Sequence, residues 1–384
     1  MLAVLLTLAL SQTVAAADLP RGDVIDEVTC LAAPGQSYAL YLPSNYTPER
    51  AWPVIYLFDA GGRGRNAVDR FRVAAEMYGY ILAGSNNSRN GRPNIDALVN
   101  MPVDVASRFH IDPRRVYTGG MSGGARVALG MALDGKVAGV FAASASYPDA
   151  EPRKAVPFAI FATTGTEDFN HLELRKFDRA LTTPHRLRGF EGGHAWPPAE
   201  LVLDGVEWME IQAMKSRLKP RDEQEIDRMF AKRLAAAGVE KDGRSAGGPG
   251  SVSDQYLALQ GLVADFQGLR EVSALAKRVA VLERDTEVQA ALKRDRDEDE
   301  REAQIVASVL AEEDRLNFSR QRLDAMSVLL KKWRQFSEAA NAPEDSADRR
   351  LARRVMAWLG LNTMTMDEEY RDLVREIRSR RPVR

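Results

Sequence analysis

A glycine-rich pentapeptide at residues 120–124, Gly-Met-Ser-Gly-Gly, constrains the fold of this chain more than any other segment. A short apolar run at 116–118 precedes it, and a helix-type run at 125–129 follows it. A strand, a tight turn and a helix in this order can expose a serine hydroxyl at the end of a sheet strand. Flanking glycines let the neighbouring backbone pass without Cβ clashes. We therefore expect Ser122 at a sharp strand-to-helix turn.

Around this turn, β-type runs alternate with helical segments from about residue 38 to residue 190. This alternation predicts an α/β fold, with a mostly parallel sheet and helices on both faces. The clearest expected strands are 54–58, 80–83, 116–118, 140–143, 158–161 and 185–188, and helices are expected at 69–78 and 94–109.

The pattern changes after about residue 218. The Gly/Ser-rich piece 246–251 is typical of a flexible joint. Beyond it, apolar residues recur at helical intervals of three and four. They form three groups: Val272, Leu275, Val279 and Leu282; Leu323, Met326, Leu330 and Trp333; and Leu351, Val355 and Leu359. The mixed-charge run 293–300 indicates a solvated helix face or connector. We expect a separate all-α C-terminal bundle of several helices.

The N-terminus has a different composition. Residues 2–10 are almost wholly apolar, and three alanines at 15–17 precede Asp18. The run is too short to span a bilayer and is typical of a signal peptide, although it lacks Lys or Arg at its start. A buried first strand or helix is the alternative. With a signal peptide, the mature protein is expected to be secreted or periplasmic, with no membrane span after cleavage.

The 384 residues favour two domains. The expected division is a signal peptide at 1–17, an α/β catalytic domain at 18–215, a linker region at 216–251 and a helical domain at 252–384. The net charge of −1 offers no argument for a nucleic-acid partner or an anionic membrane surface. The single cysteine, Cys30, has no intramolecular disulfide partner and is expected to be a small buried residue.

A serine nucleophile needs a base within hydrogen-bond reach and a carboxylate that orients the base. The chain has four histidines, which are His110, His171, His185 and His194. The order serine, acid, histidine excludes the first of them. His194 lies in a loop just after the last expected strand, so we expect it to be the base. His171 and His185 are the alternative candidates for the base. If they are not the base, they are expected to be surface residues or hydrogen-bonded structural residues.

The acid is expected in the loop 165–168, after the strand that ends at Phe161. Asp168 is the chosen residue, with Glu167 as the near alternative and Asp149 as a more distant one. A loop aspartate is often only a turn or helix cap. Here, however, the serine, the acid and the histidine follow successive strands in the order that the chemistry requires.

These segments resemble an extracellular esterase family within the α/β-hydrolases, the polyhydroxybutyrate depolymerase and feruloyl esterase type. The resemblance covers about residues 35–200 and is carried by 42–46 (LPSNY), 111–117 (IDPRRVY), 120–124, 157–168 and 193–197 (GHAWP). It implies an α/β-hydrolase fold and ester hydrolysis, with Ser122 as nucleophile, Asp168 as acid and His194 as base.

One loop departs from this resemblance. The family usually has His-Gly in the loop that supplies an oxyanion donor, whereas this chain has Asp59 and Ala60 there. An oxyanion hole needs two backbone N–H donors. We expect the N–H groups of Gly123 and Ala60, with Gly61 as the fallback. Asp59 could disfavour an anionic intermediate, or it could turn away and pair with Arg63 or Arg65.

Three further residues are expected to contact substrate: Asn86 and Asn87, in the polar segment 85–91, and Trp196 beside the base. The alternatives are an Asx turn for the asparagines and loop packing for the tryptophan. The family's polymer-binding modules are not recognisable in the helical tail.

The sequence therefore predicts a serine esterase that acts through an acyl-enzyme on a small-molecule or polymer ester and requires no metal or cofactor. A peptidase or amidase on the same fold is one alternative. A non-catalytic binding protein with a helical interaction domain is another. The helical domain could serve a protein partner or self-association.

Overall fold

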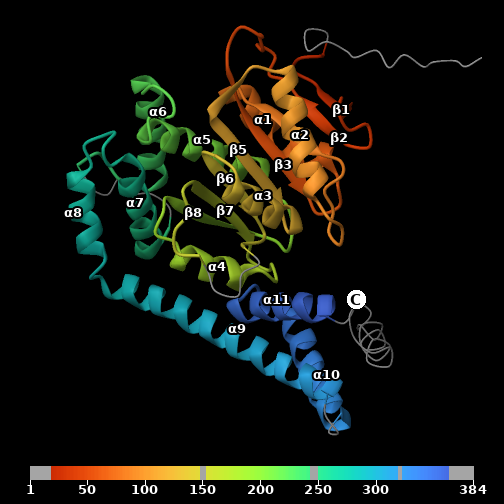
Figure 1. Ribbon diagram of the computed structural model, residues 1–384. Helices are drawn as coiled ribbons and strands as arrows, with labels where there is room; N and C mark the ends of the chain where they lie inside the picture. Colours follow the sequence, from red (N-terminus) through yellow and green to blue (C-terminus); the bar gives the residue numbers. More distant parts are fainter. Residues whose placement is uncertain (1–18, 148–152, 243–249, 319–321, 363–384) are drawn as a thin grey trace, which may run out of the picture. The chain divides into compact units, whose positions relative to one another are not determined.

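The computed structural model describes residues 19–147, 153–242, 250–318 and 322–362 (Figure 1). The chain divides into two compact units, residues 1–141 and 142–384. This division falls inside the segment 18–215, and the domain boundaries expected from the sequence stay a prediction. The expected signal peptide and most of the joint 246–251 lie outside the described residues.

The first unit contains β1 (Val24–Thr29), β2 (Ser37–Tyr41), β3 (Trp52–Asp59), β4 (Ile81–Ser85) and β5 (Ile111–Met121), with α1 (Gly64–Tyr78), α2 (Ile95–Arg108) and α3 (Gly123–Asp134). Strand β3 pairs in parallel with β4 and β5, and β1 and β2 extend the sheet in antiparallel fashion. All eight residues of β3 are buried. A continuous apolar strand is what a parallel sheet covered on both faces requires.

The second unit contains β7 (Ala159–Gly165) and β8 (His185–Phe190), which pair in parallel. Its helices include α4 (His171–Ala180), α5 (Ala199–Lys215), α6 (Glu223–Ala236), α7 (Val252–Phe266) and α8 (Ser273–Leu282). Strand β6 (Gly139–Ala143) contains the division point. The sheet has eight strands in the order β1-β2-β4-β3-β5-β6-β7-β8.

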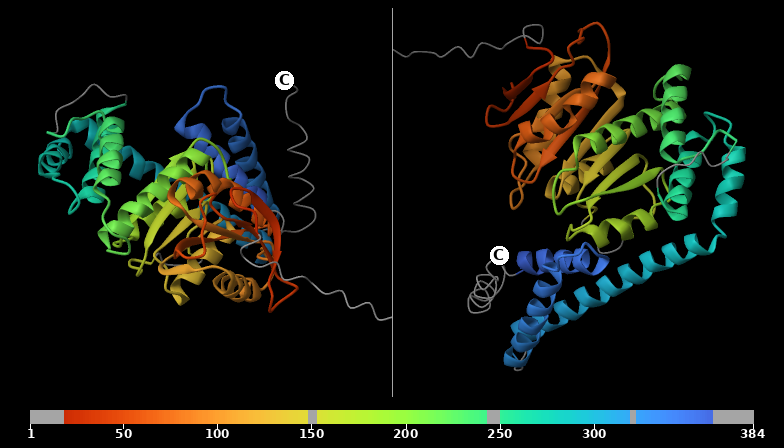
Figure 2. Two further views of the ribbon diagram at one scale, coloured as in Figure 1. Left: turned by 90° about the horizontal axis from the view of Figure 1, so that it is seen from above. Right: turned by 180° about the vertical axis from the view of Figure 1, so that it is seen from behind.

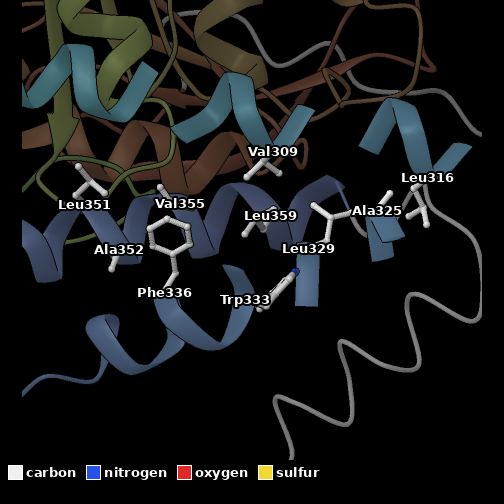
Figure 3. Packing of buried hydrophobic residues seen from close by; sticks show 10 residues of the cluster. All are labelled: Val309, Leu316, Ala325, Leu329, Trp333, Phe336, Leu351, Ala352, Val355 and Leu359. Carbon is white, nitrogen blue, oxygen red and sulfur yellow. The ribbon is translucent and has the colours of Figure 1, made fainter. Parts of the chain in front are cut away.

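In the part of the chain that the structure describes, α8 is followed by α9 (Thr286–Phe318), α10 (Arg322–Ala340) and α11 (Ala347–Asn362). We call them the helical arm. Figure 2 shows, from two further sides, that α10 and α11 fold back beside the long α9. Their apolar faces meet in a core of the arm's own (Figure 3), formed by Val309, Leu316, Ala325, Leu329, Trp333, Phe336, Leu351, Ala352, Val355 and Leu359.

The α/β class expected from the sequence is confirmed, because every expected strand is present and helices separate the parallel strands. Strands β1 and β2 were not expected as a pair. Strand β1 is an edge strand with mostly exposed or half-buried side chains, so it lacks an apolar signature. Within the described ranges, no helix combines the length and apolar character that crossing a membrane requires.

Two helical segments differ in detail from the expectation. Helix α6 occupies residues 223–236 of the segment expected as linker, and it buries Ile226, Met229, Phe230 and Leu234. In α10, the expected stripe is correct for Trp333, which is buried, and for Met326, which packs against the arm's core, but Leu323 is 74% exposed. The buried stripe runs through Ala325, Leu329, Trp333 and Phe336. Both stripes have helical spacing, so periodicity alone does not distinguish them.

The start of α3 passes very close to the end of β3. A Cβ atom on Gly124 would lie 2.1 Å from the carbonyl oxygen of Phe58, so only glycine fits there. We expect Gly124→Ala to cost about 1–3 kcal/mol through forced backbone shifts. Thermal unfolding followed by circular dichroism should show a melting temperature lower by about 2–12 °C.

Gly130→Ala is the matched control for that substitution. Gly130 lies in the same helix, and its added Cβ would meet nothing within 4 Å. Replacing a helical glycine by alanine in open space stabilises by about 0.5–1 kcal/mol. Equal melting temperatures for the two variants would contradict the close packing of α3 against β3.

Candidate active site

Ser122 lies at the turn between β5 and α3, with φ of 57° and ψ of −123°. A residue with a side chain rarely adopts this backbone conformation, which costs about 1–3 kcal/mol and is concentrated at functional sites. Its carbonyl oxygen accepts hydrogen bonds from the backbone N–H groups of Ala125 and Arg126. Its hydroxyl, by contrast, does not cap the helix. The strained turn is the geometry expected for an exposed serine nucleophile.

Gly123 follows the serine as the first residue of α3. The first N–H groups of a helix have no partner within the helix, and the helix dipole makes this end attractive to negative charge. The side chain of Asn90 fills the space where a Cβ of Gly123 would be, since such an atom would lie 1.7 Å from Asn90 Oδ1. Position 123 therefore admits only glycine while Asn90 keeps this place.

The Asp59 carboxylate is completely buried and forms a local turn. Its Oδ1 accepts hydrogen bonds from the N–H of Gly61 and from Arg63 Nε, both at 2.8 Å. The N–H of Gly62 donates to the carbonyl of Asp59 at 3.1 Å. Of Arg63 and Arg65, it is Arg63 that pairs with Asp59. With the N–H groups of Gly61 and Gly62 engaged inside the loop, Ala60 stays the expected second oxyanion donor.

Asn90 also contacts this loop through its backbone, since its N–H donates to the carbonyl of Ala60 at 2.9 Å. Asn90 thus touches both residues expected to supply oxyanion donors. From the sequence, Asn90 is only one member of the polar segment 85–91, where no local pattern marks it out from Asn86 and Asn87.

Asn86 and Asn87 use their amide groups within the sheet edge. Asn86 Nδ2 donates to the carbonyl of Asp26 at 3.1 Å. Asn87 Nδ2 donates to the carbonyl of Gly35 at 3.0 Å, and its Oδ1 accepts from the N–H of Ser37 at 2.8 Å. These contacts fix the segment that joins β1 and β2. A role in substrate contact stays a prediction for both residues.

Asp168 and His194 lie together in the second unit, in the loops that follow β7 and β8. His194 Nδ1 is 2.8 Å from Asp168 Oδ1, and the carboxylate is completely buried. The same oxygen accepts a hydrogen bond from the N–H of Asn170 at 2.8 Å. An ionised carboxylate only accepts, so Nδ1 carries the proton and Nε2 presents a lone pair. This is the orientation that a general base requires.

The base is held from two further sides. The ring of Phe169 stacks on that of His194, with centroids 4.0 Å apart and planes at 29°. Ser144, at φ of 59°, donates through Oγ to the carbonyl of Ala195 at 3.1 Å and accepts at its own carbonyl from Asn170 Nδ2 at 2.8 Å. Phe169, Ser144 and Asn170 could not be found from the sequence, because contacts between loops leave no local pattern.

We call residues 165–168 the acid loop and residues 190–196 the base loop. Their backbones are joined directly. The N–H of Thr166 donates to the carbonyl of Phe190 at 2.9 Å, and the N–H of Glu167 donates to that of Gly192 at 2.8 Å. A displacement of either loop therefore moves the other, and with it the distance between Asp168 and His194.

The alternative candidates have structural contacts. His185 Nδ1 lies 2.7 Å from the carbonyl of Thr183, and Glu167 pairs with Arg353 at 2.5 Å. Trp196 is only 8% exposed, which favours loop packing. Asp149 lies outside the described residues.

Burial raises the pKa of the Cys30 thiol to about 11, so it is not a reactive thiolate at neutral pH.

His171 is partly buried, with its Nδ1 3.1 Å from the carbonyl of Gly165. Burial, followed by the positive charges of Arg354 and Arg175, lowers its pKa to about 4, against opposing effects of the Gly165 carbonyl and Asp299. Because the pKa of His171 in the folded protein lies below the unfolded value of 6.5, protonation of this ring favours the unfolded state. Its contribution to the free energy of unfolding is therefore fully present above pH 6.5 and is lost as the pH falls toward 4.

Glutamine does not titrate, so we expect His171→Gln to reduce the loss of unfolding free energy between pH 7 and pH 4 by roughly 2–3 kcal/mol. Urea unfolding at pH 7, 5 and 4 measures it, with wild type as reference. An unchanged slope of unfolding free energy against pH in the variant would contradict a neutral, partly buried His171.

No protein-family model matches the chain, and no curated protein sequence matches it. Solved structures of esterases do. A mutant of the feruloyl esterase module from Clostridium thermocellum, complexed with sinapinate, is 16% identical with a TM-score of 0.40, over 48% of this chain and 86% of that one. A ferulic acid esterase is 17% identical with a TM-score of 0.38, over 49% of this chain and 96% of that one.

Thermogutta terrifontis esterase 2, phosphonylated by sarin, is 14% identical with a TM-score of 0.35, over 49% of this chain and 92% of that one. Each of these similarities covers about half of this chain, with a TM-score of 0.40 or less. They agree with the esterase resemblance expected from the sequence, and the roles proposed below come from the chain's own residues.

Proposed function

We propose that this protein is a serine esterase in which Ser122, His194 and Asp168 form a catalytic triad. The observation that carries the proposal is the buried Asp168 carboxylate bound to His194 Nδ1 at 2.8 Å, which leaves Nε2 available as a base. The strained turn at Ser122, with φ of 57°, supports it from the nucleophile's side.

The proposed reaction has two halves. Ser122 Oγ attacks the ester carbonyl carbon while His194 Nε2 takes the hydroxyl proton. The negative oxygen of the tetrahedral intermediate accepts hydrogen bonds from the N–H groups of Gly123 and Ala60. The intermediate collapses, and the alcohol leaves with the proton from the imidazolium. Water, deprotonated by His194, then attacks the acyl-enzyme, and the acid is released as the serine regains its proton.

Asp168 keeps the imidazole in the productive tautomer and stabilises the imidazolium that forms in each half. None of these steps uses a metal or cofactor. The apolar segment 1–17 further supports secretion or export to the periplasm, so small or polymeric esters outside the cytoplasm are the proposed substrates.

The test compares purified protein on p-nitrophenyl acetate and butyrate with the matching p-nitroanilides. The proposal expects saturable ester turnover and much slower anilide turnover. Preferred hydrolysis of the anilides would move the assignment to an amidase or peptidase. Background rates on both classes would contradict catalysis and favour a binding protein.

A further inference from the structure

Three arginines on one side of α11 contact the acid and base loops, although nearly 190 residues separate them from the acid loop in sequence. Arg353 Nη1 lies 2.5 Å from Glu167 Oε1. Arg354 Nη1 donates to the carbonyl of Thr166 at 2.8 Å. Arg350 Nη2 lies 3.3 Å from Oε2 of Glu191 in the base loop. We call Arg350, Arg353 and Arg354 the arginine clamp.

Arg354 is the fixed centre of this clamp, with only 2% of its surface exposed. Its Nη2 lies 2.7 Å from Oε2 of Glu302, which is equally buried, and donates to Glu298 Oε1 at 2.9 Å. Both glutamates belong to α9. A buried guanidinium is tolerated only when its donors are paired, and its planar fork holds several acceptors at set angles. One side chain thus joins α9 to the carbonyl two residues before Asp168.

The clamp stands on a firmly packed helix. Leu351, Val355 and Leu359 of α11 lie in the core of the helical arm together with Trp333 of α10 (Figure 3). The guanidinium groups therefore cannot move far unless the arm's core moves as well.

A second contact joins the arm to the helix that follows the acid loop. Asp299 of α9 is only 6% exposed. It pairs with Arg175 of α4 at 2.8 Å and also with Arg179. Helix α4 begins at His171, three residues after the acid. The arm thus contacts both the acid loop and the helix that follows it.

We infer that the arginine clamp positions the acid and base loops, so that the helical arm belongs to the catalytic machinery instead of serving only as an appended interaction module. Arg353 and Arg354 are positioning residues, because they touch Glu167 and Thr166 and act on Asp168 through the backbone. This inference rests on the proposed function of Asp168 and His194.

The test uses the full chain with Arg353→Gln, the double variant Arg354→Gln/Glu302→Gln, and a matched control. The double variant removes both members of the buried pair, and the second partner of Arg354, Glu298, has a side chain that is 33% exposed, so no deeply buried charge is left unpaired. Arg301→Gln is the control, because Arg301 pairs with Asp348 within the arm and both side chains are exposed, at 59% and 68%.

For ester hydrolysis, we expect kcat to fall about threefold in Arg353→Gln and about 10- to 100-fold in the double variant, with KM little changed. The control should match wild type. A charge swap, Arg353→Glu with Glu167→Arg, should recover most of the kcat that either single change loses. A swap no better than its single variants would overturn the inference.

Hydrogen exchange gives a readout that does not depend on activity. Amides at 163–171 and 190–196 should exchange faster in Arg353→Gln and in the double variant, and at the wild-type rate in the control. Unchanged exchange in both loops would overturn the inference even if the protein is an active esterase. Faster exchange in a protein without esterase activity would support the clamp and contradict the proposed function.

Discussion

Ser122→Ala is expected to lower kcat for p-nitrophenyl butyrate by about 10⁴-fold or more, with the fold intact. Without Oγ no acyl-enzyme forms, and the residual rate would come from binding and the oxyanion donors alone. Alanine meets the same backbone strain at φ of 57°, and the Ser122 hydroxyl does not cap α3, so the substitution should not lower the melting temperature appreciably. Initial rates and thermal unfolding of both proteins measure these two effects.

Ser107→Ala is the matched control for the nucleophile. The Ser107 hydroxyl donates to the carbonyl of Asp104 at 2.7 Å on α2, a local helix contact. Its loss should leave kcat within about twofold of wild type, because it removes one helical side-chain bond. If Ser122→Ala kept more than a tenth of the wild-type kcat, Ser122 would not be the nucleophile.

Asp168→Asn is expected to lower kcat by about 10⁴-fold while KM stays nearly constant. An amide at this position can present its NH₂ group to His194 Nδ1, which favours the tautomer with the proton on Nε2. That tautomer cannot accept the serine proton. The effect should be large here because the carboxylate is completely buried and its Oδ2 has no hydrogen-bond partner among the described residues.

The chain offers a second aspartate and histidine pair as the control. Asp178 Oδ1 lies 3.6 Å from His185 Nε2, in the same unit but away from the acid loop. Asp178→Asn should change kcat by less than about threefold, as expected for a pair outside the reaction. Similar losses in the two variants would show that the assay reports general destabilisation instead of catalysis.

The proposed triad can be derived from the sequence because the turn at Ser122 is a local pattern and the order of the three residues along the chain requires no structure. A serine between glycines at a strand-to-helix junction is recognisable without a structure, and the order serine, acid, histidine then selects Asp168 and His194. The backbone conformation of Ser122 and the contact between the other two residues agree with that reasoning.

The supporting residues could not be predicted, because their roles depend on which loops meet. Phe169 follows the acid in sequence, yet its stacking on His194 depends on the path of the base loop. The arginines of α11 read as the polar face of an amphipathic helix. Only the folded chain brings Arg354 to a carbonyl 188 residues away.

Asp59 shows a case in which the sequence left two readings open. Its carboxylate, placed in the expected oxyanion loop, could either oppose an anion or pair with a nearby arginine. The hydrogen bond to Arg63 Nε at 2.8 Å and the local turn through Gly61 favour the second reading. A paired carboxylate of this kind opposes a neighbouring oxyanion less than an unpaired one.

Mass spectrometry of the protein after exposure to a fluorophosphonate tests the central claim most directly, since such reagents phosphonylate activated serine hydroxyls. The account predicts one adduct per chain, on the peptide that contains Ser122, absent after denaturation and absent in Ser122→Ala. An adduct on a different residue of the folded protein, or ester turnover that continues without any adduct, would contradict it.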